Sequence, residues 1–163
     1  SENFLQVPEP LIQKEFSRIM SLKDGSKKMS KSELSNLSRI NLADDKDLII
    51  NKIKKAKTDP LPMPDTIKDL EDRLEAKNLL GIYACLTNST LEKSIEIFAG
   101  KNFSEFKEKL SEVLVDKIQP ISIEIKKLLD DKSYLDTILL EGAERANIIA
   151  SKKIKKIKEI IGF

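Results

Sequence analysis

The last third of the sequence carries the feature that most restricts its fold, an apolar pattern with helical spacing from residue 135 to residue 157. Side chains three and four positions apart share one face of an α-helix, so this spacing predicts one long helix with a continuous apolar face. Ser133 and Asp136 are expected to cap its start. The residues of the face are Leu135, Ile138, Leu139, Gly142, Ala143, Ala146, Ile149, Ala150, Ile154 and Ile157.

Upstream segments show the same spacing and carry signals for helix ends. Asp44 is expected to cap a first helix, which the prolines from Pro60 onward terminate. With Asp45 it forms an acidic pair at a helix start, a pattern more typical of a cap and a dipole partner than of a metal site. A second helix is expected from about Asp69 to Leu86. The chain is therefore predicted to be mainly α.

Two more helices are predicted between residues 89 and 129. Ser89 and Glu92 match a capping box for a short helix that Gly100 closes. From Ser104 a further apolar pattern continues beyond Pro120. An interior proline removes a hydrogen bond and costs about 3 kcal/mol, so the segment is expected to be one kinked helix or two helices that meet there.

The first 42 residues lack helical spacing. Arg18 to Leu22 is expected to form a short strand leading into an open loop rich in Gly, Ser and Lys. A strand and a loop cannot form a core by themselves. We therefore expect residues 1–42 to be the end of a larger domain, and residues 43–163 to form a helical domain. The apolar residues that would need partners from elsewhere are Phe4, Leu5, Val7, Leu11 and Ile12.

Composition narrows the chemistry and the location. The sequence has no histidine, so a Ser-His-Asp triad and an ordinary zinc site are excluded for these residues, and no metal site is predicted. The single Cys85 lies among apolar residues and is expected to be a packed, reduced thiol. Net charge is only +2, and the apolar runs are too short to cross a bilayer. A cytoplasmic protein is expected, with import into an organelle left open.

One polar cluster has the composition of a phosphate-binding loop. It is Asp24-Gly25-Ser26-Lys27-Lys28-Met29-Ser30-Lys31-Ser32. Lysine side chains, hydroxyls and backbone amides all donate hydrogen bonds to phosphate oxygens. Composition by itself favours a solvated basic turn over a phosphate site, because charged loops are usually surface. The order of the residues distinguishes a solvated basic turn from a phosphate-binding site.

That order resembles a known family. Lys28-Met29-Ser30-Lys31-Ser32 is the KMSKS motif of class I aminoacyl-tRNA synthetases, and residues 38–59 resemble the tryptophan branch of that class. Differences from the family pattern occur at Leu74, where proline is frequent, and at Glu33, where aspartate is frequent. The resemblance extends over essentially the whole chain, through Asn78-Leu79-Leu80-Gly81-Ile82-Tyr83, Phe106-Lys107, Gln119-Pro120-Ile121 and Gly142-Ala143-Glu144-Arg145-Ala146.

The resemblance implies the carboxy-terminal part of a tryptophanyl-tRNA synthetase. Its fold would be a helical bundle preceded by a short strand and the KMSKS loop, both left over from a missing Rossmann-type catalytic domain. The family's HIGH-type motif is absent from the sequence, so the chain by itself is expected to be inactive. The complete enzyme would use ATP with Mg²⁺ to activate tryptophan, transfer it to tRNA(Trp), and be a homodimer.

Residue roles follow from the same resemblance. Lys28 and Lys31 are the expected catalytic residues, meeting the negative charge that grows on departing pyrophosphate. Lys27 is undecided between ligand contact and solvated charge, and Arg39 between bridging the loop to the helical domain and forming a surface ion pair. The expected ATP-binding set is Ile19, Lys28, Met29, Ser30, Lys31 and Ser32.

The end of the last helix is the expected tRNA-binding surface. Ile154, Ile157 and Ile161 would pin the helix to its domain while the lysines between them point outward. Lysines near a helix end also complement its dipole, so a purely structural role stays open. The lysines assigned to tRNA are Lys152, Lys153, Lys155 and Lys156. The alternative for the whole chain is a stand-alone helical binding or scaffolding module whose basic loop has no catalytic role.

Overall fold

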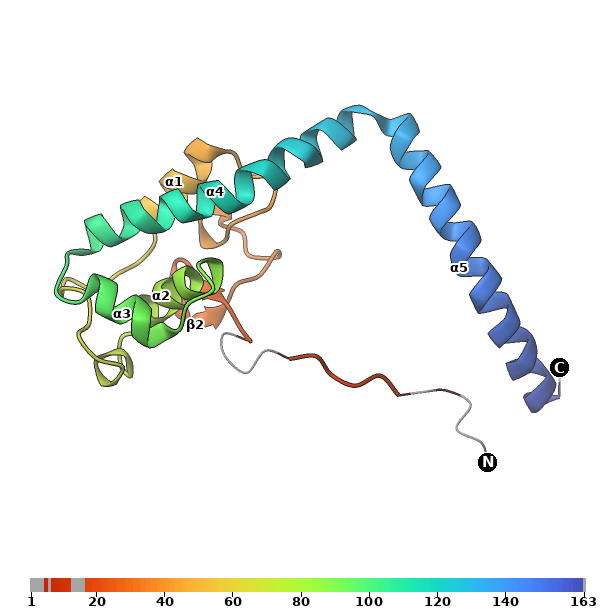
Figure 1. Ribbon diagram of the computed structural model, residues 1–163, viewed down its shortest axis with the longest axis horizontal. Coiled ribbons are helices and arrows are strands. Elements are labelled where there is room, and N and C mark those ends of the chain that lie inside the picture. Colours follow the sequence, from red (N-terminus) through yellow and green to blue (C-terminus); the bar gives the residue numbers. More distant parts are fainter. Residues whose placement is uncertain (1–4, 6, 13–16, 163) are drawn as a thin grey trace. The chain divides into compact units, whose positions relative to one another are not determined.

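The computed structural model describes residues 5, 7–12 and 17–162, and most of them lie in helices (Figure 1). The chain divides into two compact units, residues 1–119 and residues 120–163. The mainly α fold class with a short strand is confirmed. The predicted domain boundary between residues 42 and 43 lies inside the first unit and stays a prediction. Phe4, one of the apolar residues predicted to lack partners, lies outside the described residues, whereas Leu5, Val7, Leu11 and Ile12 are exposed.

The elements follow each other in a simple order along the chain. A two-stranded antiparallel sheet comes first, then the helices, with short 3₁₀ turns at Asn36–Ser38 and Lys68–Leu70. Among the described residues, none of the helices combines the length and the apolar character needed to cross a membrane. The bounds are β1 Met20–Ser21, β2 Asp24–Lys28, α1 Lys46–Lys54, α2 Leu74–Leu86, α3 Leu91–Phe98, α4 Phe103–Asp130 and α5 Lys132–Ile161.

The core of the first unit is centred on α2. This helix is apolar on nearly all sides, and it buries Leu79 and Leu80 fully. Three aromatic rings from α2, α3 and α4 meet edge to face, with Tyr83 and Phe98 centroids 4.9 Å apart and Phe98 and Phe106 centroids 4.8 Å apart. Such contacts fix ring orientations as well as burying area. As a result, α2 is held in a fixed position, and segments that pack on it are positioned by it.

A hairpin replaces part of the predicted open loop. Met20 in β1 lies opposite Lys28 in β2, while the next residue, Ser21, lies opposite Asp24, so residues 25–27 form a bulge. Gly25 permits this arrangement, because a Cβ there would lie 2.8 Å from the backbone nitrogen of Glu75 at the start of α2. The loop prediction was wrong for residues 24–28 because the glycine serves a close packing contact instead of loop flexibility.

Three helix starts were predicted one or two residues away from the side chain that caps them. Asp45, not Asp44, accepts from Leu48 N at 2.9 Å. The other two caps are Thr90 in place of Ser89, accepting from Lys93 N at 3.4 Å, and Asp131 in place of Ser133, accepting from Tyr134 N at 3.0 Å. Each true cap has a nearby residue of similar capping propensity, and only the backbone geometry distinguishes them. Gly100, with φ +70°, ends α3 as predicted.

The second half of the chain is helical as predicted, and a single helix, α4, runs through Pro120. No described residue of α5 is buried, and Ile154 and Ile161 are 51% and 61% exposed, so the prediction that these isoleucines pin the helix was wrong. A second correction concerns Cys85, which is exposed on the outer side of α2, contrary to the expected packed thiol.

Candidate functional site

The hairpin brings together the two ends of the predicted nucleotide site. Met29 N donates to Ile19 O at 3.0 Å, although the two residues belong to opposite arms of the hairpin. Both side chains are half-buried and pack against the core. The Ile19 backbone and the KMSKS motif are thus held beside each other by a backbone hydrogen bond and by apolar packing. Figure 1 shows the hairpin, with β2 labelled, next to α2.

Asn78 is a contact residue of the hairpin that sequence reasoning missed. Its side chain accepts from Met20 N and donates to Met20 O, both at 2.8 Å. The two residues are 58 positions apart, and Asn78 lies in a helix of otherwise mostly apolar residues. An isolated polar residue on a buried face was the available signal, because buried amides need partners.

Leu22, in the turn of the hairpin, joins it to two further segments. Leu22 N donates to Ser38 O at 2.9 Å, and Lys57 N donates to Leu22 O at 2.7 Å. Ser38 follows the KMSKS motif, and Lys57 follows α1. The chain therefore returns to the turn of the hairpin after the motif, so the segments on both sides of the motif are anchored.

The lysines of the motif differ in their surroundings. Lys28 and Lys31 are exposed, at the end of β2 and just after it. Lys27 forms an ion pair with Asp24 at 3.3 Å, and its side chain is 71% exposed. The pKa of Asp24 is lowered mainly by hydrogen bonds from the Ser26 hydroxyl and backbone, with a smaller contribution from Lys27. Lys27 is thus a largely exposed charge paired with Asp24.

The motif serines shape the turn. Ser30 Oγ and Ser32 Oγ are 2.9 Å apart, and Ser32 N donates to Ser30 Oγ at 3.3 Å. Such local bonds replace regular secondary structure and hold the backbone in a turn. Lys31 lies between the two serines and projects from this turn. Every one of the predicted nucleotide-binding residues therefore lies on one hairpin and the turn that follows it.

Arg39 braces the segment after the motif. Its guanidinium donates to Glu33 O at 2.9 Å and to Asn41 Oδ1 at 3.2 Å. These are contacts to a carbonyl and an amide, so the surface ion pair considered from the sequence is not what the structure contains. Instead, Arg39 ties the start of the segment to the residues just before α1.

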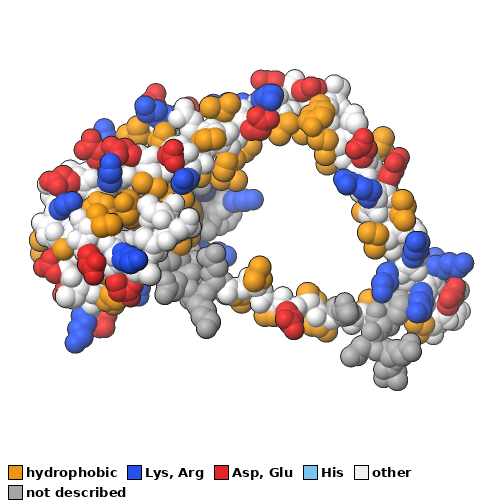
Figure 2. All heavy atoms as spheres, viewed as in Figure 1, with side chains coloured by type: hydrophobic (Ala, Val, Ile, Leu, Met, Phe, Trp, Pro, Cys, Tyr) orange, Lys and Arg blue, Asp and Glu red, His pale blue; other side chains and the backbone are white. Residues whose placement is uncertain are grey.

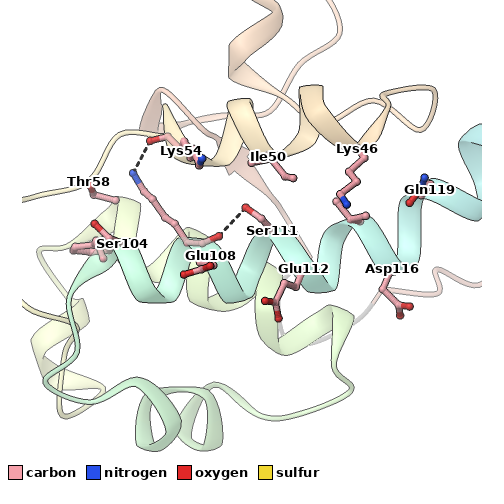
Figure 3. Close-up of a pocket in the computed structure, with 13 residues that line it drawn as sticks. Lys46, Ile50, Lys54, Thr58, Ser104, Glu108, Ser111, Glu112, Asp116 and Gln119 are labelled. Atoms are coloured by element: carbon pink, nitrogen blue, oxygen red, sulfur yellow. Dashed lines mark hydrogen bonds between the residues drawn. The ribbon is translucent and has the colours of Figure 1, made fainter.

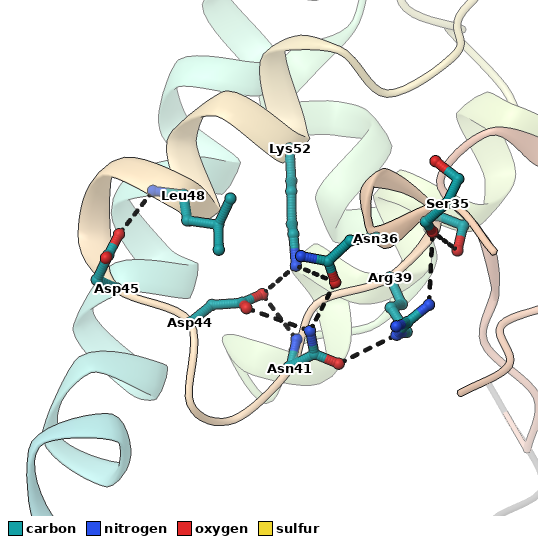
Figure 4. Close-up of polar contacts among 9 residues, drawn as sticks. Ser35, Asn36, Arg39, Asn41, Asp44, Asp45, Leu48 and Lys52 are labelled. Carbon is teal, nitrogen blue, oxygen red and sulfur yellow. Dashed lines mark hydrogen bonds and ion pairs between the residues drawn. The ribbon is translucent and has the colours of Figure 1, made fainter. Parts of the chain in front are cut away.

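A buried polar network lies under this segment (Figure 4). Lys52 of α1 is fully buried and forms an ion pair with Asp44, which is 5% exposed. Asp44 also accepts from Asn41 N at 2.8 Å, and Lys52 donates to Asn36 Oδ1 at 3.3 Å. Buried charges are tolerated when they are paired and hydrogen-bonded. Asp44 is thus the partner of Lys52 and no helix cap, and the network attaches the chain after the motif to α1.

A second ion pair joins the segment after α1 to the start of α2. Lys57 Nζ lies 2.8 Å from a Glu75 carboxylate oxygen. The Lys57 hydrogen bond lowers the pKa of Glu75, with a smaller contribution from the backbone of Gly25, and the pKa of Lys57 is raised by the same pair. Glu75 therefore contacts both the residue after α1 and the hairpin.

A groove between α1 and the first half of α4 lies apart from these residues (Figure 3). Lys107 of α4 donates to Lys54 O at 3.2 Å and to Ala56 O at 2.7 Å, satisfying carbonyls at the end of α1. Burial lowers the pKa of Lys107. The groove includes none of the residues predicted to bind nucleotide or tRNA, and its polar wall has a structural role at this helix end.

The lysines predicted to face tRNA lie near the end of α5. Lys152, Lys153, Lys155 and Lys156 are all exposed. Figure 2 shows basic side chains gathered at that end of the helix. Among the described residues, no group of three or more acidic, histidine or cysteine side chains could hold a metal ion.

Comparison with known proteins agrees with this arrangement. The family described as tRNA synthetases class I (W and Y) matches residues 1–119. A tryptophan–tRNA ligase of Agrobacterium fabrum is 49% identical over 98% of the chain and 45% of its own length. That of Rickettsia felis is 50% identical over 99% of the chain and 48% of its own length. The chain spans about half the length of these relatives.

Solved structures of tryptophanyl-tRNA synthetases have a similar fold. A tryptophanyl-tRNA synthetase from Mycoplasma pneumoniae has a TM-score of 0.74 at 24% identity, covering 93% of this chain and 45% of that one, and this likeness shows the fold alone. The Campylobacter jejuni enzyme complexed with ADP and tryptophan has a TM-score of 0.68 at 26% identity, covering 98% of this chain and 48% of that one.

The chain carries an unbroken KMSKS motif on a hairpin set on a helical core, and the class I synthetase family matches the part of the chain that contains both. The chain belongs to the tRNA synthetases class I (W and Y) family. Within that family its similarity is to the tryptophan–tRNA ligases, so the resemblance predicted from the sequence is confirmed.

Proposed function

We propose that this chain works as part of a complete tryptophan–tRNA ligase, which activates tryptophan with Mg²⁺-ATP and transfers it to tRNA(Trp). The observation that carries the proposal is the KMSKS motif held next to the Ile19 backbone by the Met29–Ile19 hydrogen bond. This places two exposed lysines, two serine hydroxyls and backbone groups on one small surface. That combination fits the phosphates and the base of a nucleotide.

Lys28 and Lys31 have the charge that the activation step needs. When the carboxylate of tryptophan attacks the α-phosphorus of ATP, the bond to pyrophosphate breaks and negative charge grows on the departing oxygens. Ammonium groups that approach those oxygens stabilise the transition state more than the ground state. Neither lysine has to donate or accept a proton. Ser30 and Ser32 keep the turn in shape and offer hydroxyl donors, and Met29 anchors it to the core.

The lysine roles are tested by ATP–pyrophosphate exchange in the complete ligase. Lys28→Ala and Lys31→Ala are each expected to lower the activation rate about 100- to 1000-fold, the effect of removing one electrostatic transition-state donor. The affinity for ATP is expected to fall much less. Equal losses in rate and in ATP affinity would mean that the lysines only bind the ground state.

Lys27→Ala is the matched control for these variants. It removes the same charge from the neighbouring position, but Lys27 is paired with Asp24 on the surface. Its activation rate is expected to stay within about twofold of the wild type, because exposed ion pairs contribute little. A loss as large as that of Lys28→Ala would point to a general effect of positive charge and would contradict specific roles for Lys28 and Lys31.

The chain by itself is proposed to be inactive. The relatives are about twice as long, and the HIGH-type motif of the family does not occur in this sequence. Residues 1–163 alone are expected to show no tryptophan-dependent exchange of pyrophosphate with ATP. Measurable exchange would refute this part of the proposal, and absence of exchange in the complete protein would favour a binding module with no catalytic role.

A further inference from the structure

Asn78 holds the outer edge of the hairpin. In an antiparallel pair, hydrogen-bonded residue pairs alternate with pairs whose backbone groups point away from the partner strand. Ile19 and Met29 form a hydrogen-bonded pair, so Met20, one position further along, directs its N–H and C=O away from Lys28. Both of those groups are bonded to the Asn78 side chain at 2.8 Å. Asn78 therefore occupies the place of a third strand.

The support behind Asn78 is rigid. Asn78 is 8% exposed, and the next two residues of α2, Leu79 and Leu80, are fully buried in the core. Four residues earlier, the backbone of α2 lies against Gly25 of β2. One helix thus contacts both strands of the hairpin, β1 through an amide side chain and β2 through close backbone packing. The position of the hairpin follows the position of α2.

We propose that Asn78 is a positioning residue for ATP. By fixing Met20 it fixes the neighbouring Ile19 backbone and, through the Met29–Ile19 bond, the start of the KMSKS turn. It does this without touching the nucleotide. This inference rests on the function proposed above, because it assigns to Asn78 the alignment of the surface that binds ATP. Under the function proposed above, tryptophan binds in parts of the complete ligase outside that surface.

Asn78→Asp tests the inference in the complete ligase. The substitution keeps the size of the side chain and an acceptor for Met20 N, but it replaces the donor to Met20 O with a second acceptor, so two oxygens face each other. We expect the KM for ATP in pyrophosphate exchange to rise about tenfold because the Ile19 backbone shifts, and kcat to fall as well, because the same shift displaces Lys28 and Lys31. The KM for tryptophan is expected to change by less than about twofold, because the tryptophan site does not depend on the hairpin.

A second variant, Asn78→Ser, is a smaller change and keeps the test valid if Asn78→Asp fails to fold. Asn78→Ser leaves a hydroxyl too short to replace both bonds, and a smaller increase of the KM for ATP, in the same direction, is expected. Hydrogen exchange in the peptide that contains Met20 gives a second readout. The Met20 amide is expected to lose protection in Asn78→Ser and to keep more of it in Asn78→Asp, which retains an acceptor for Met20 N, while the peptides of α3 keep theirs in both variants.

Ser94→Ala is the matched control. Ser94 is fully buried, its hydroxyl donates to Thr90 O at 3.0 Å, and it lies on α3 away from the hairpin. Its loss is expected to lower thermal stability without changing the ratio of the two KM values. If Asn78→Asp raised both KM values equally, or changed only stability as Ser94→Ala does, the positioning role would be refuted.

The outcomes separate the two proposals. Exchange activity in the wild-type ligase supports the proposed function whatever the Asn78 variants do. An active wild type whose KM for ATP is unaffected by Asn78→Asp would refute only the role of Asn78. A wild type without exchange activity would refute the proposed function, and with it the inference.

Discussion

At the scale of single residues, the ion pair of Lys52 and Asp44 is notable because both side chains are buried. A lysine with no exposed surface is tolerated only while its charge is balanced and its donors are used. Its partners Asp44 and Asn36 both come from the chain between the KMSKS motif and α1. The pair therefore connects the motif's return segment to the core.

Removing the charge of Asp44 is expected to destabilise the protein strongly. In Asp44→Asn the side chain keeps its shape, but the Lys52 ammonium is left buried without a counter-charge, which typically costs about 3–5 kcal/mol. The free energy of unfolding in urea measures the loss. A loss below about 1 kcal/mol would show that Lys52 reaches water or another anion in solution.

The double variant Asp44→Asn with Lys52→Met is the control. It removes both charges while filling a similar volume, so it is expected to be more stable than Asp44→Asn alone. Purely additive losses would mean that the two side chains do not depend on each other.

At the scale of elements, the sequence predicted helices well and their caps and the hairpin poorly. Helices were recognisable because apolar spacing repeats over many residues, as in α5. A helix cap is the residue with extended backbone angles just before the helix. The sequence does not show which of two neighbours this is, because Asp44 and Asp45, or Ser89 and Thr90, have similar capping propensity. The hairpin was missed because β1 is too short to show alternation, and because its outer edge is completed by Asn78, 58 positions away.

For the candidate site, too, one part could be predicted from the sequence and another could not. The motif itself was identified from the order of its residues, and its two lysines are exposed in the structure. What holds it in place could not be predicted, because Asn78, Gly25 and Lys52 act through contacts between distant segments. A sequence pattern indicates local periodicity only. These contacts depend on how the helices pack, so no local pattern predicts them.

The ion pair of Glu75 and Lys57 predicts how acid affects the junction between α1, α2 and the hairpin. The pKa of Glu75 is lowered from 4.5, so its contribution to stability is present above that pH and is lost as the pH falls through the lower, folded value. The pKa of Lys57 is raised from 10.5, so its contribution disappears only as the pH rises above that value. Between these limits the pair is intact.

Glu75→Gln is therefore expected to flatten the acid side of the stability profile. Between pH 7 and pH 3, urea midpoints should fall less steeply for the variant than for the wild type, with most of the difference arising below pH 4.5. Glu71→Gln, an exposed carboxylate nearby, is the control and should follow the wild type. Identical profiles for Glu75→Gln and the wild type would show that the pair does not persist in solution.

At the scale of the whole molecule, the lysines of α5 are proposed to bind tRNA phosphates. Replacing Lys152, Lys155 and Lys156 by Glu in the complete ligase is expected to weaken tRNA binding. The dependence of log Kd on log salt is expected to decrease by about 0.7–0.9 for each phosphate that the variant no longer neutralises. Adenylate formation should be nearly unchanged, because these residues are distant in sequence from the hairpin and belong to the other compact unit.

A second triple variant controls for net charge. Lys68, Lys77 and Lys93 are exposed residues of the first unit, and replacing them by Glu changes the net charge by the same amount. This variant should bind tRNA with nearly wild-type affinity. If both triple variants weakened binding equally at low salt, the effect would be one of overall charge, and no specific tRNA surface could be assigned to α5.

The bulge in β2 indicates where related sequences are free to gain or lose residues. Ile19 opposite Met29 and Met20 opposite Lys28 fix the pairing from the open end of the hairpin, while residues 25–27 are the surplus near its turn. An insertion beside Ser26 or Lys27 would only enlarge the bulge. An insertion after Lys28 would turn Met29 to the opposite face and remove it from the core. Length variation during evolution is therefore expected before the motif and not within it.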